Sequence, residues 1–142
     1  MQTIDPTPIE ISRFIGNMHD TRMWETITNR KMALPFCDHC NAAVYPPFGS
    51  CAGCLRAELP WRTLSGRGKI VSWTRFHRSY LPAYPAPHVV IAVELEEGAI
   101  MISNLVGPSP EDDLWIGQHV VMRYLDRHGT VLPVFEIVSA AS

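Results

Sequence analysis

In the second half of the chain, apolar and polar residues alternate along five short segments. The clearest is 89–96, which reads VVIAVELE and carries an aliphatic residue at every odd-numbered position. A period of two residues places successive side chains on opposite faces of a strand, so we expect strands that each bury one face. The predicted strands span residues 69–78, 89–96, 99–106, 118–125 and 131–138.

The connections between these segments indicate how the strands are arranged. Glu97-Gly98 and Gly129 mark tight turns, and 107–117 is a longer break with room for a short helical turn. Pro133 places part of the last strand at an edge or a bulge, because proline lacks the N–H that a ladder needs. The layout predicts a mainly β fold with a five-stranded OB-fold barrel, and leaves an SH3-like barrel as the alternative.

The N-terminal region carries helical signals instead. Thr7-Pro8-Ile9-Glu10 is typical of a helix start with a capping box, and a second helix is expected over 21–32. Both segments are short for isolated helices, so this arm must dock on something. It either packs on its own domain or grips a partner protein, with Phe14 and Trp24 as anchors.

All four cysteines of the chain lie between residues 37 and 54. Cys37 and Cys40 form one Cys-x-x-Cys pair, and Cys51 and Cys54 form another after ten intervening residues. Two such turns facing each other make a tetrahedral thiolate cage that suits zinc. The spacing predicts a small rubredoxin-like zinc ribbon.

Four thiolate ligands leave no open position on the ion, so the metal is expected to be structural. His39 is then a solvated residue of the first turn, and Gly53 supplies backbone freedom in the second. Disulfides are the alternative, but the N-terminus lacks a secretory signal pattern, which favours a reducing cytoplasm.

These elements divide the chain into an N-terminal helical arm over 1–33, a zinc ribbon over 34–58 and an OB-fold domain over 59–142. Residues 59–67 are expected to form the linker, with Trp61 packed in the seam. The aromatic stretch Tyr45-Pro46-Pro47-Phe48 lies between the two cysteine pairs. We expect it to cover the metal site or the seam.

Composition excludes several classes of function. The net charge is −2, from 12 basic and 14 acidic residues, and no basic tract marks a nucleic-acid binder. No apolar run approaches the length of a membrane span.

Catalysis by this chain alone is not expected. The cysteines are committed to the metal and no Gly-x-Ser-x-Gly nucleophile motif occurs. The four histidines of the second half of the chain are scattered: His77, His88, His119 and His128. We therefore assign no catalytic residue.

The order of motifs resembles a known family. A helical arm and a Cys-x-x-Cys ribbon precede SGRGKIVSWT at 65–74, VELEEG at 93–98, SNLVG at 103–107, Ile116-Gly117, and LPVF at 132–135. This combination resembles the acyl-CoA-associated OB-fold proteins with a rubredoxin-like zinc ribbon, catalogued as domain of unknown function thirty-five. The resemblance covers about residues 23–137.

The resemblance implies a role in a larger complex. Members of that family are small subunits, or C-terminal domains, that bind thiolase-superfamily proteins acting on acyl-CoA thioesters. The catalytic residues usually belong to the larger partner. The small subunit stabilises the complex and in some cases helps to hold CoA or to close the substrate tunnel.

If CoA contacts this chain, the basic residues along the first strand are the candidates. These are Arg67, Lys69, Arg75 and Arg78. Strict alternation places Arg67, Lys69, Arg75 and His77 on one side, where guanidinium groups suit the CoA phosphates. Solvated surface charge is the alternative. The proline-stiffened loop 80–87 is expected to contact a partner or ligand.

Three hypotheses follow. The leading one is a non-catalytic accessory subunit of a thiolase-like acyl-CoA complex. The second is a single-stranded nucleic-acid binder, which needs exposed aromatic residues on the second and third strands. The third is a stand-alone acyl-CoA-binding protein.

Overall fold

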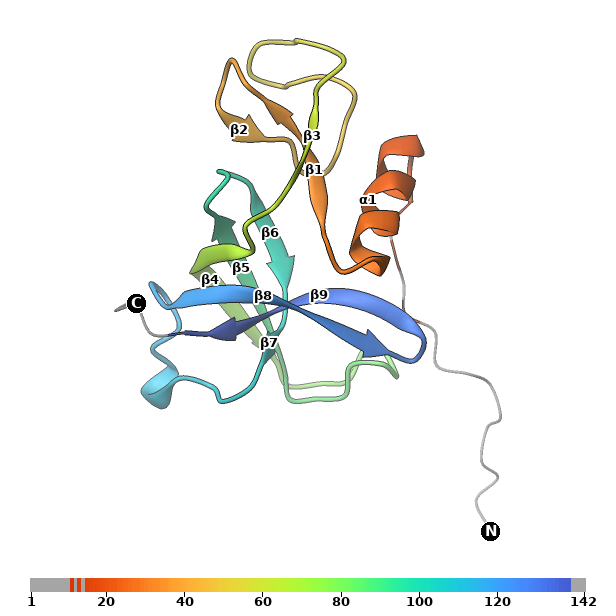
Figure 1. The fold of residues 1–142 in the computed structure, drawn as a ribbon. Coiled ribbons are helices and arrows are strands. Elements are labelled where there is room, and N and C mark those ends of the chain that lie inside the picture. Colours follow the sequence, from red (N-terminus) through yellow and green to blue (C-terminus); the bar gives the residue numbers. More distant parts are fainter. Residues whose placement is uncertain (1–10, 12, 14, 139–142) are drawn as a thin grey trace.

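The computed structural model describes residues 11, 13 and 15–138. It contains a helix, a small three-stranded sheet and a larger six-stranded sheet (Figure 1). The small sheet and helix α1 stand on one side of the larger sheet. The fold is mainly β, as the sequence predicts.

Helix α1 spans Met18–Thr28. Asn17 caps it by accepting from the N–H groups of His19 and Asp20, and the Asp20 carboxylate accepts from the N–H of Asn17 in return. This reciprocal pair satisfies backbone donors that the first helical turn leaves free. The structure thus confirms the helix predicted over 21–32, but the helix begins three residues earlier, at Met18.

The same helix ends before its predicted boundary at residue 32. Arg30 adopts a left-handed backbone with φ of 60°. Its N–H donates to Ile27 and the N–H of Lys31 donates to Thr26, which closes a Schellman motif. The other predicted helix start, Thr7-Pro8-Ile9-Glu10, lies outside the described residues.

The ribbon is built on strand β1, Ala33–Cys37, which is buried along its whole length. It pairs with β2, Ala42–Ala43, on one side and with β3, Trp61–Thr63, on the other. We predicted a linker over residues 59–67. This was wrong for Trp61–Thr63, because these residues form a strand that pairs with residues 33–35 of β1. The division of the chain at residues 33 and 58 stays a prediction.

The larger sheet confirms the predicted strands, with ends shifted by at most two residues. Its strands are β4 Arg67–Phe76, β5 His88–Leu95, β6 Ile100–Ser103, β7 Leu105–Val106, β8 His119–Arg127 and β9 Thr130–Ile137. The third predicted strand is split at Asn104 into β6 and β7. A short 3-10 turn, Glu111–Asp113, lies in the predicted break.

The strand order is β6-β5-β4-β8-β9-β7. Strand β6 pairs with β5 at one end of this order, and β7 pairs in parallel with β9 at the other. Since β6 and β7 are separated only by Asn104, the two ends of the order meet in one stretch of chain. The sheet therefore curls back on itself, as the Greek-key layout requires.

Pro133 lies opposite Tyr124 of β8. Strand β7 reaches β9 only at Phe135 and Glu136, so Pro133 occupies the half of β9 that has no second described neighbour. The predicted edge position is confirmed, and the missing N–H of proline interrupts no ladder.

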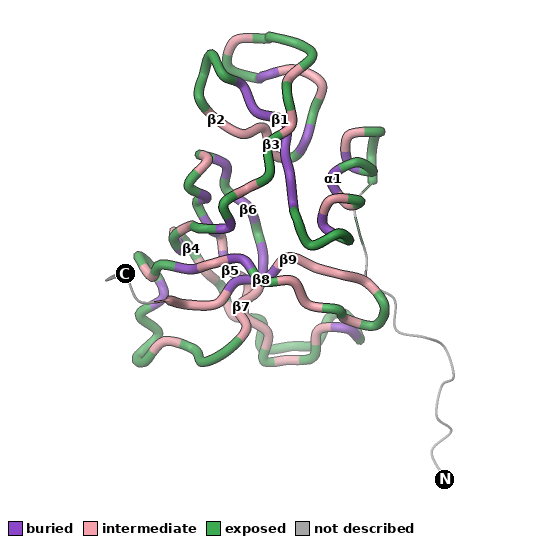
Figure 2. Tube along the Cα trace, in the orientation of Figure 1, coloured by how far each residue is buried: buried purple, intermediate pink, exposed green. Residues whose placement is uncertain are grey.

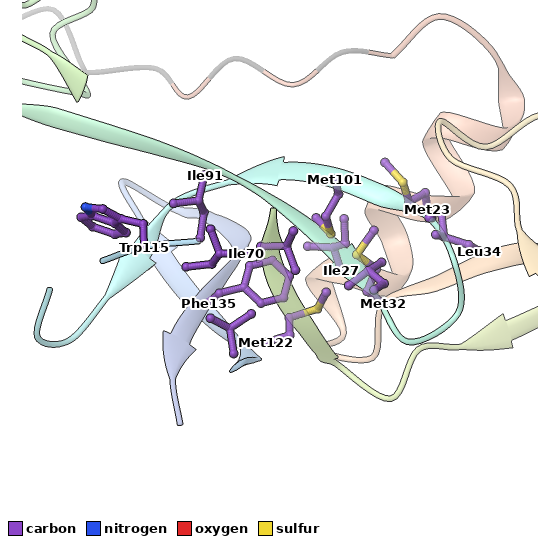
Figure 3. Close-up of a cluster of buried hydrophobic side chains, with 14 residues drawn as sticks. Met23, Ile27, Met32, Leu34, Ile70, Ile91, Met101, Trp115, Met122 and Phe135 are labelled. Carbon is purple, nitrogen blue, oxygen red and sulfur yellow. The ribbon is translucent and has the colours of Figure 1, made fainter. Parts of the chain in front are cut away.

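One hydrophobic core joins the helix, the ribbon and the larger sheet (Figure 3). Met23 and Ile27 of α1 and Leu34 of β1 lie at one end of it, and Ile91 and Phe135 lie deeper in the barrel. The inner face of α1 is buried along this contact (Figure 2). Helix α1 therefore packs on its own domain, which was one of the two alternatives.

The predicted anchors of a partner contact are not tested by this packing. Trp24 is half-buried beside the core, and Phe14 lies outside the described residues. No helix in the described part of the chain is long and apolar enough to cross a membrane.

Candidate metal centre and adjoining surfaces

The structure brings the sulfur atoms of Cys37, Cys40, Cys51 and Cys54 to within 4.8 Å of one another. Cys37 Sγ lies 3.5 Å from Cys54 Sγ, and Cys40 Sγ lies 3.7 Å from Cys51 Sγ. A tetrahedral ion with metal–sulfur bonds of about 2.3 Å sets neighbouring sulfurs ~3.8 Å apart. These separations are too long for disulfides, and the four thiols fit a metal ion such as zinc.

The two Cys-x-x-Cys turns share one backbone feature. The residue after each second cysteine, Asn41 or Leu55, has a left-handed backbone with φ of 56° or 64°. This residue reverses the chain beyond each turn. Asn tolerates the conformation well, whereas a leucine rarely adopts it.

Gly53 serves the second turn differently from the prediction, since it is not among the glycines with positive φ. A Cβ at this position would lie 3.3 Å from Cys40 Sγ. Glycine therefore avoids a tight contact with the sulfurs here, and a positive φ is not its reason.

Local hydrogen bonds distinguish two of the thiols, Cys51 and Cys40. The backbone N–H groups of Cys54 and Gly53 stabilise the thiolate of Cys51 and lower its pKa to about 7. The side chains of Cys51 and Cys54 instead raise the pKa of Cys40 to about 12. Backbone donors aimed at sulfur are the groups that hold negative charge at such turns.

In the aromatic stretch between the cysteine pairs, Tyr45 covers the seam. Tyr45 packs against the core cluster, and burial raises the pKa of its hydroxyl. Phe48 is 58% exposed. In the first turn, Asp38 pairs with Arg62 of β3, whose guanidinium lies over the ring of Phe36.

The predicted CoA residues do not share one face. A bulge at Val71 shifts the register of β4 against β5 between Ile70 and Ser72. Beyond it, Arg75 falls on the same side as Trp73, over whose ring its guanidinium lies. The predicted alternation was wrong because a bulge inserts one unpaired residue and reverses the sides that follow.

The four basic residues predicted to contact CoA differ in whether they form an ion pair. Arg67 pairs with Glu96, and Arg75 pairs with Asp113 at 2.6 Å. Within the described residues, neither Lys69 nor Arg78 lies within ion-pair distance of a carboxylate. Whether any of them contacts CoA stays a prediction.

Arg78 borders a cleft of about 310 Å³ on the outer side of the larger sheet. The cleft lies between strands β5 and β6 and the loop after β4. Its lining comprises Phe76, Arg78, Tyr80, Leu81, Tyr84, His88, Val90, Ile102, Ser103 and Asn104. Sequence reasoning identified the tyrosine loop but missed Val90 and Ile102, which the period-two pattern indicated only as strand residues.

The outer face of β6 is aliphatic. Ile100 is 52% exposed and Ile102 is 62% exposed. Aromatic stacking platforms for single-stranded nucleic acid do not occupy these two positions.

Comparisons with known proteins find relatives described as ChsH2 or DUF35 proteins. The profile of the family described as "ChsH2, C-terminal OB-fold domain" matches residues 61–125. The chain is similar to a "DUF35 domain-containing scaffold protein" of Methanocaldococcus jannaschii, with 32% identity over 102 residues, covering 70% of this chain and 72% of that protein.

A longer relative is a "Probable enoyl-CoA hydratase alpha subunit" of Thermomonospora curvata. Identity is 34% over 120 residues, which cover 82% of this chain but only 37% of that protein. Among solved structures, a chain of the "Ltp2-ChsH2(DUF35) aldolase" is similar at a TM-score of 0.76 and 30% identity. The match covers 88% of this chain and 98% of that one.

Proposed function

The chain belongs to the DUF35 family, and from that premise we propose that it is a non-catalytic accessory subunit of a thiolase-like acyl-CoA complex. The observation that carries the proposal is the similarity to a chain of the Ltp2-ChsH2(DUF35) aldolase, which extends over nearly the whole of that chain. Two further relatives are named an alpha subunit and a scaffold protein. Both names describe proteins that act within assemblies.

The four-cysteine cluster supports a structural role for zinc in this subunit. Cys37, Cys40, Cys51 and Cys54 would occupy all four positions of a tetrahedral ion, leaving none for substrate. Cys37 ends β1, whose Leu34 lies in the shared core, so the metal would hold the ribbon in place against the barrel. Thiolates of this kind require a reducing compartment, and we place the complex in the cytoplasm on that ground.

The basic residues of β4 and the following loop are proposed as contacts for CoA phosphates: Arg67, Lys69, Arg75 and Arg78. Lys69 and Arg78 are the better candidates, because Arg67 and Arg75 would first have to leave their acidic partners. A phosphate contact at an unpaired cation requires no such exchange.

Coexpression tests the accessory role. This chain and a thiolase-like protein from the same organism are produced separately and together, and complexes are measured by size-exclusion chromatography with light scattering. We expect a stable complex with acyl-CoA activity that neither chain shows alone. A chain that stays monomeric and leaves the activity of the thiolase-like protein unchanged would refute the proposal.

A further inference from the structure

The cleft beside Arg78 is bounded by a well-anchored loop. Arg127 donates to the carbonyl of Ala83 at 2.8 Å, and its guanidinium lies 5.0 Å from the centre of the Tyr84 ring. Within the loop, the N–H of Ala86 donates to Ser79 Oγ and the N–H of Tyr84 donates to Leu81. These bonds hold the loop as a wall of the cleft.

Three polar side chains in the walls, those of Asn104, His88 and Ser103, make hydrogen-bond contacts within the protein. Asn104 Nδ2 donates to the carbonyl of Val89 at 2.8 Å and also lies 3.1 Å from His88 Nε2. Since the amide nitrogen only donates, His88 Nε2 must accept, which makes the ring neutral with its proton on Nδ1. Ser103 donates to the carbonyl of Pro133.

Two further features agree with an uncharged interior. Burial, together with the nearby charge of Arg127, lowers the pKa of His88. The rest of the wall is aliphatic or aromatic, from Phe76, Val90 and Ile102 among others. A charged group placed against this aliphatic and aromatic part of the wall would lose hydration, so an uncharged group fits it better.

The mouth of the cleft has the opposite character. Arg78 is exposed there, and within the described part of the chain it forms no ion pair. A ligand that fits both parts therefore has an uncharged apolar body and an anionic end. The volume of about 310 Å³ is at the lower limit of ligand pockets, which span roughly 300–1,000 Å³.

We infer that this cleft binds the acyl chain of an acyl thioester, with Arg78 facing the anionic carrier to which the chain is attached. The inference rests on the proposed function and adds to it a site within this subunit and the class of its ligand. Val90 and Ile102 contact the chain, and loop 77–87 covers it.

An adjoining cavity gives the site room to extend. A cavity of about 190 Å³ shares Tyr84, Ile102, Ser103 and Asn104 with the cleft. Its far side is lined by Met23, Met32 and Met101, whose flexible side chains adapt to different shapes. The two spaces therefore meet at these shared residues, and the methionine side is where a longer chain would extend.

Strand β6 offers a matched pair of variants for the test. Ile102 lines the cleft, whereas Ile100, two residues away on the same face, does not. Both are more than half exposed, so tryptophan is tolerated at either site and circular dichroism can verify the fold. Octanoyl-CoA, CoA and octanoate are titrated into the full-length, metal-loaded chain by calorimetry.

We expect octanoyl-CoA to bind more tightly than either CoA or octanoate. Ile102→Trp should weaken this binding at least about tenfold, the effect of exposing roughly two methylene groups, and Ile100→Trp should leave it unchanged. Arg78→Ala should weaken octanoyl-CoA binding as well. Equal binding by the two tryptophan variants, or octanoate binding as tightly as octanoyl-CoA, would overturn the inference.

Complex formation with the thiolase-like protein is measured on the same variants. Loss of octanoyl-CoA binding by Ile102→Trp with the complex intact supports the site. If the wild-type chain binds no octanoyl-CoA and Ile102→Trp prevents complex formation, the cleft is a protein contact, and the inference fails while the accessory role stands.

Discussion

The backbone N–H of Met32 donates a 2.7 Å hydrogen bond to the phenolic oxygen of Tyr124. Met32 lies between helix α1 and strand β1, and Tyr124 lies in β8 of the larger sheet. Arg30 strengthens the same junction by donating to the carbonyl of Tyr124 at 3.1 Å. One tyrosine thus connects the helix-to-ribbon turn to the barrel.

Replacing Tyr124 with phenylalanine should destabilise this junction. Met32 is 1% exposed, so its N–H would lose its partner without access to water. We expect the free energy of unfolding in urea to fall by about 1–3 kcal/mol. Tyr80→Phe is the control, since Tyr80 is 71% exposed, and an equal loss in both variants would contradict the assignment.

The alternation of apolar and polar residues predicted the strands of the barrel well, because each of these strands buries one face. Strand β3 was missed for a physical reason. Its partner in β1 lies nearly thirty residues earlier, and three residues are too few to display a period. The cap of α1 was missed because Asn17 and Asp20 form a capping box with residue types other than the usual Ser or Thr with Glu or Gln.

The cysteine cluster, the basic residues of β4 and the cleft also differ in how far the sequence alone predicts them. Cysteine spacing is a local signal, so the sequence alone predicted that the four sulfurs come together. The side of β4 that each basic residue occupies depends on the bulge at Val71, which no residue in that segment signals. The cleft is assembled from β5, β6 and the loop after β4, and only the folded chain brings Val90 and Ile102 together.

Cys40→Ala should release the metal and unfold the ribbon. Zinc binding to a tetrathiolate site contributes roughly 10–16 kcal/mol at neutral pH, compared with ~5–15 kcal/mol for the net stability of a domain. Cys40 is exposed, so alanine removes little packing and the change reports on the metal. Elemental analysis should find about one zinc per wild-type chain and much less in the variant, with a lower melting temperature.

His39→Ala provides the control for that measurement, because His39 lies in the same turn and is exposed. It should retain zinc and the wild-type melting temperature. Retention of metal by Cys40→Ala, or loss of metal from His39→Ala, would show that the ligand set is wrong.

Asp113→Asn should change how stability depends on pH. Its hydrogen bond with Arg75 lowers the pKa of Asp113 below the ordinary value of about 3.8. A lowered carboxyl pKa contributes stability above its unfolded value, and this contribution is lost as pH falls through the folded value. The variant should therefore be less stable than wild type at pH 7, and the two melting temperatures should converge as the pH falls below the unfolded value of about 3.8 and through the lowered folded value.

Asp112→Asn is a matched control because both residues have a left-handed backbone that asparagine tolerates. Asp112 forms no ion pair within the described residues. Asparagine at 113 also keeps an oxygen for the indole N–H of Trp115. A constant difference between Asp113→Asn and wild type across this range would exclude the ion pair as its source.

Leu55→Gly should stabilise the metal-loaded protein. Leu55 has φ of 64° and is 78% exposed, so its side chain contributes strain to the second cysteine turn and little packing. A left-handed non-glycine residue costs roughly 1–2 kcal/mol, and the extra freedom of glycine in the unfolded chain offsets about 0.5–1 kcal/mol of that. Denaturation at saturating zinc should show a gain of up to ~1 kcal/mol. Leu114→Gly, at a similarly exposed position with φ of −82°, should instead lower stability, and a loss in both variants would mean that Leu55 packs in the assembled turn.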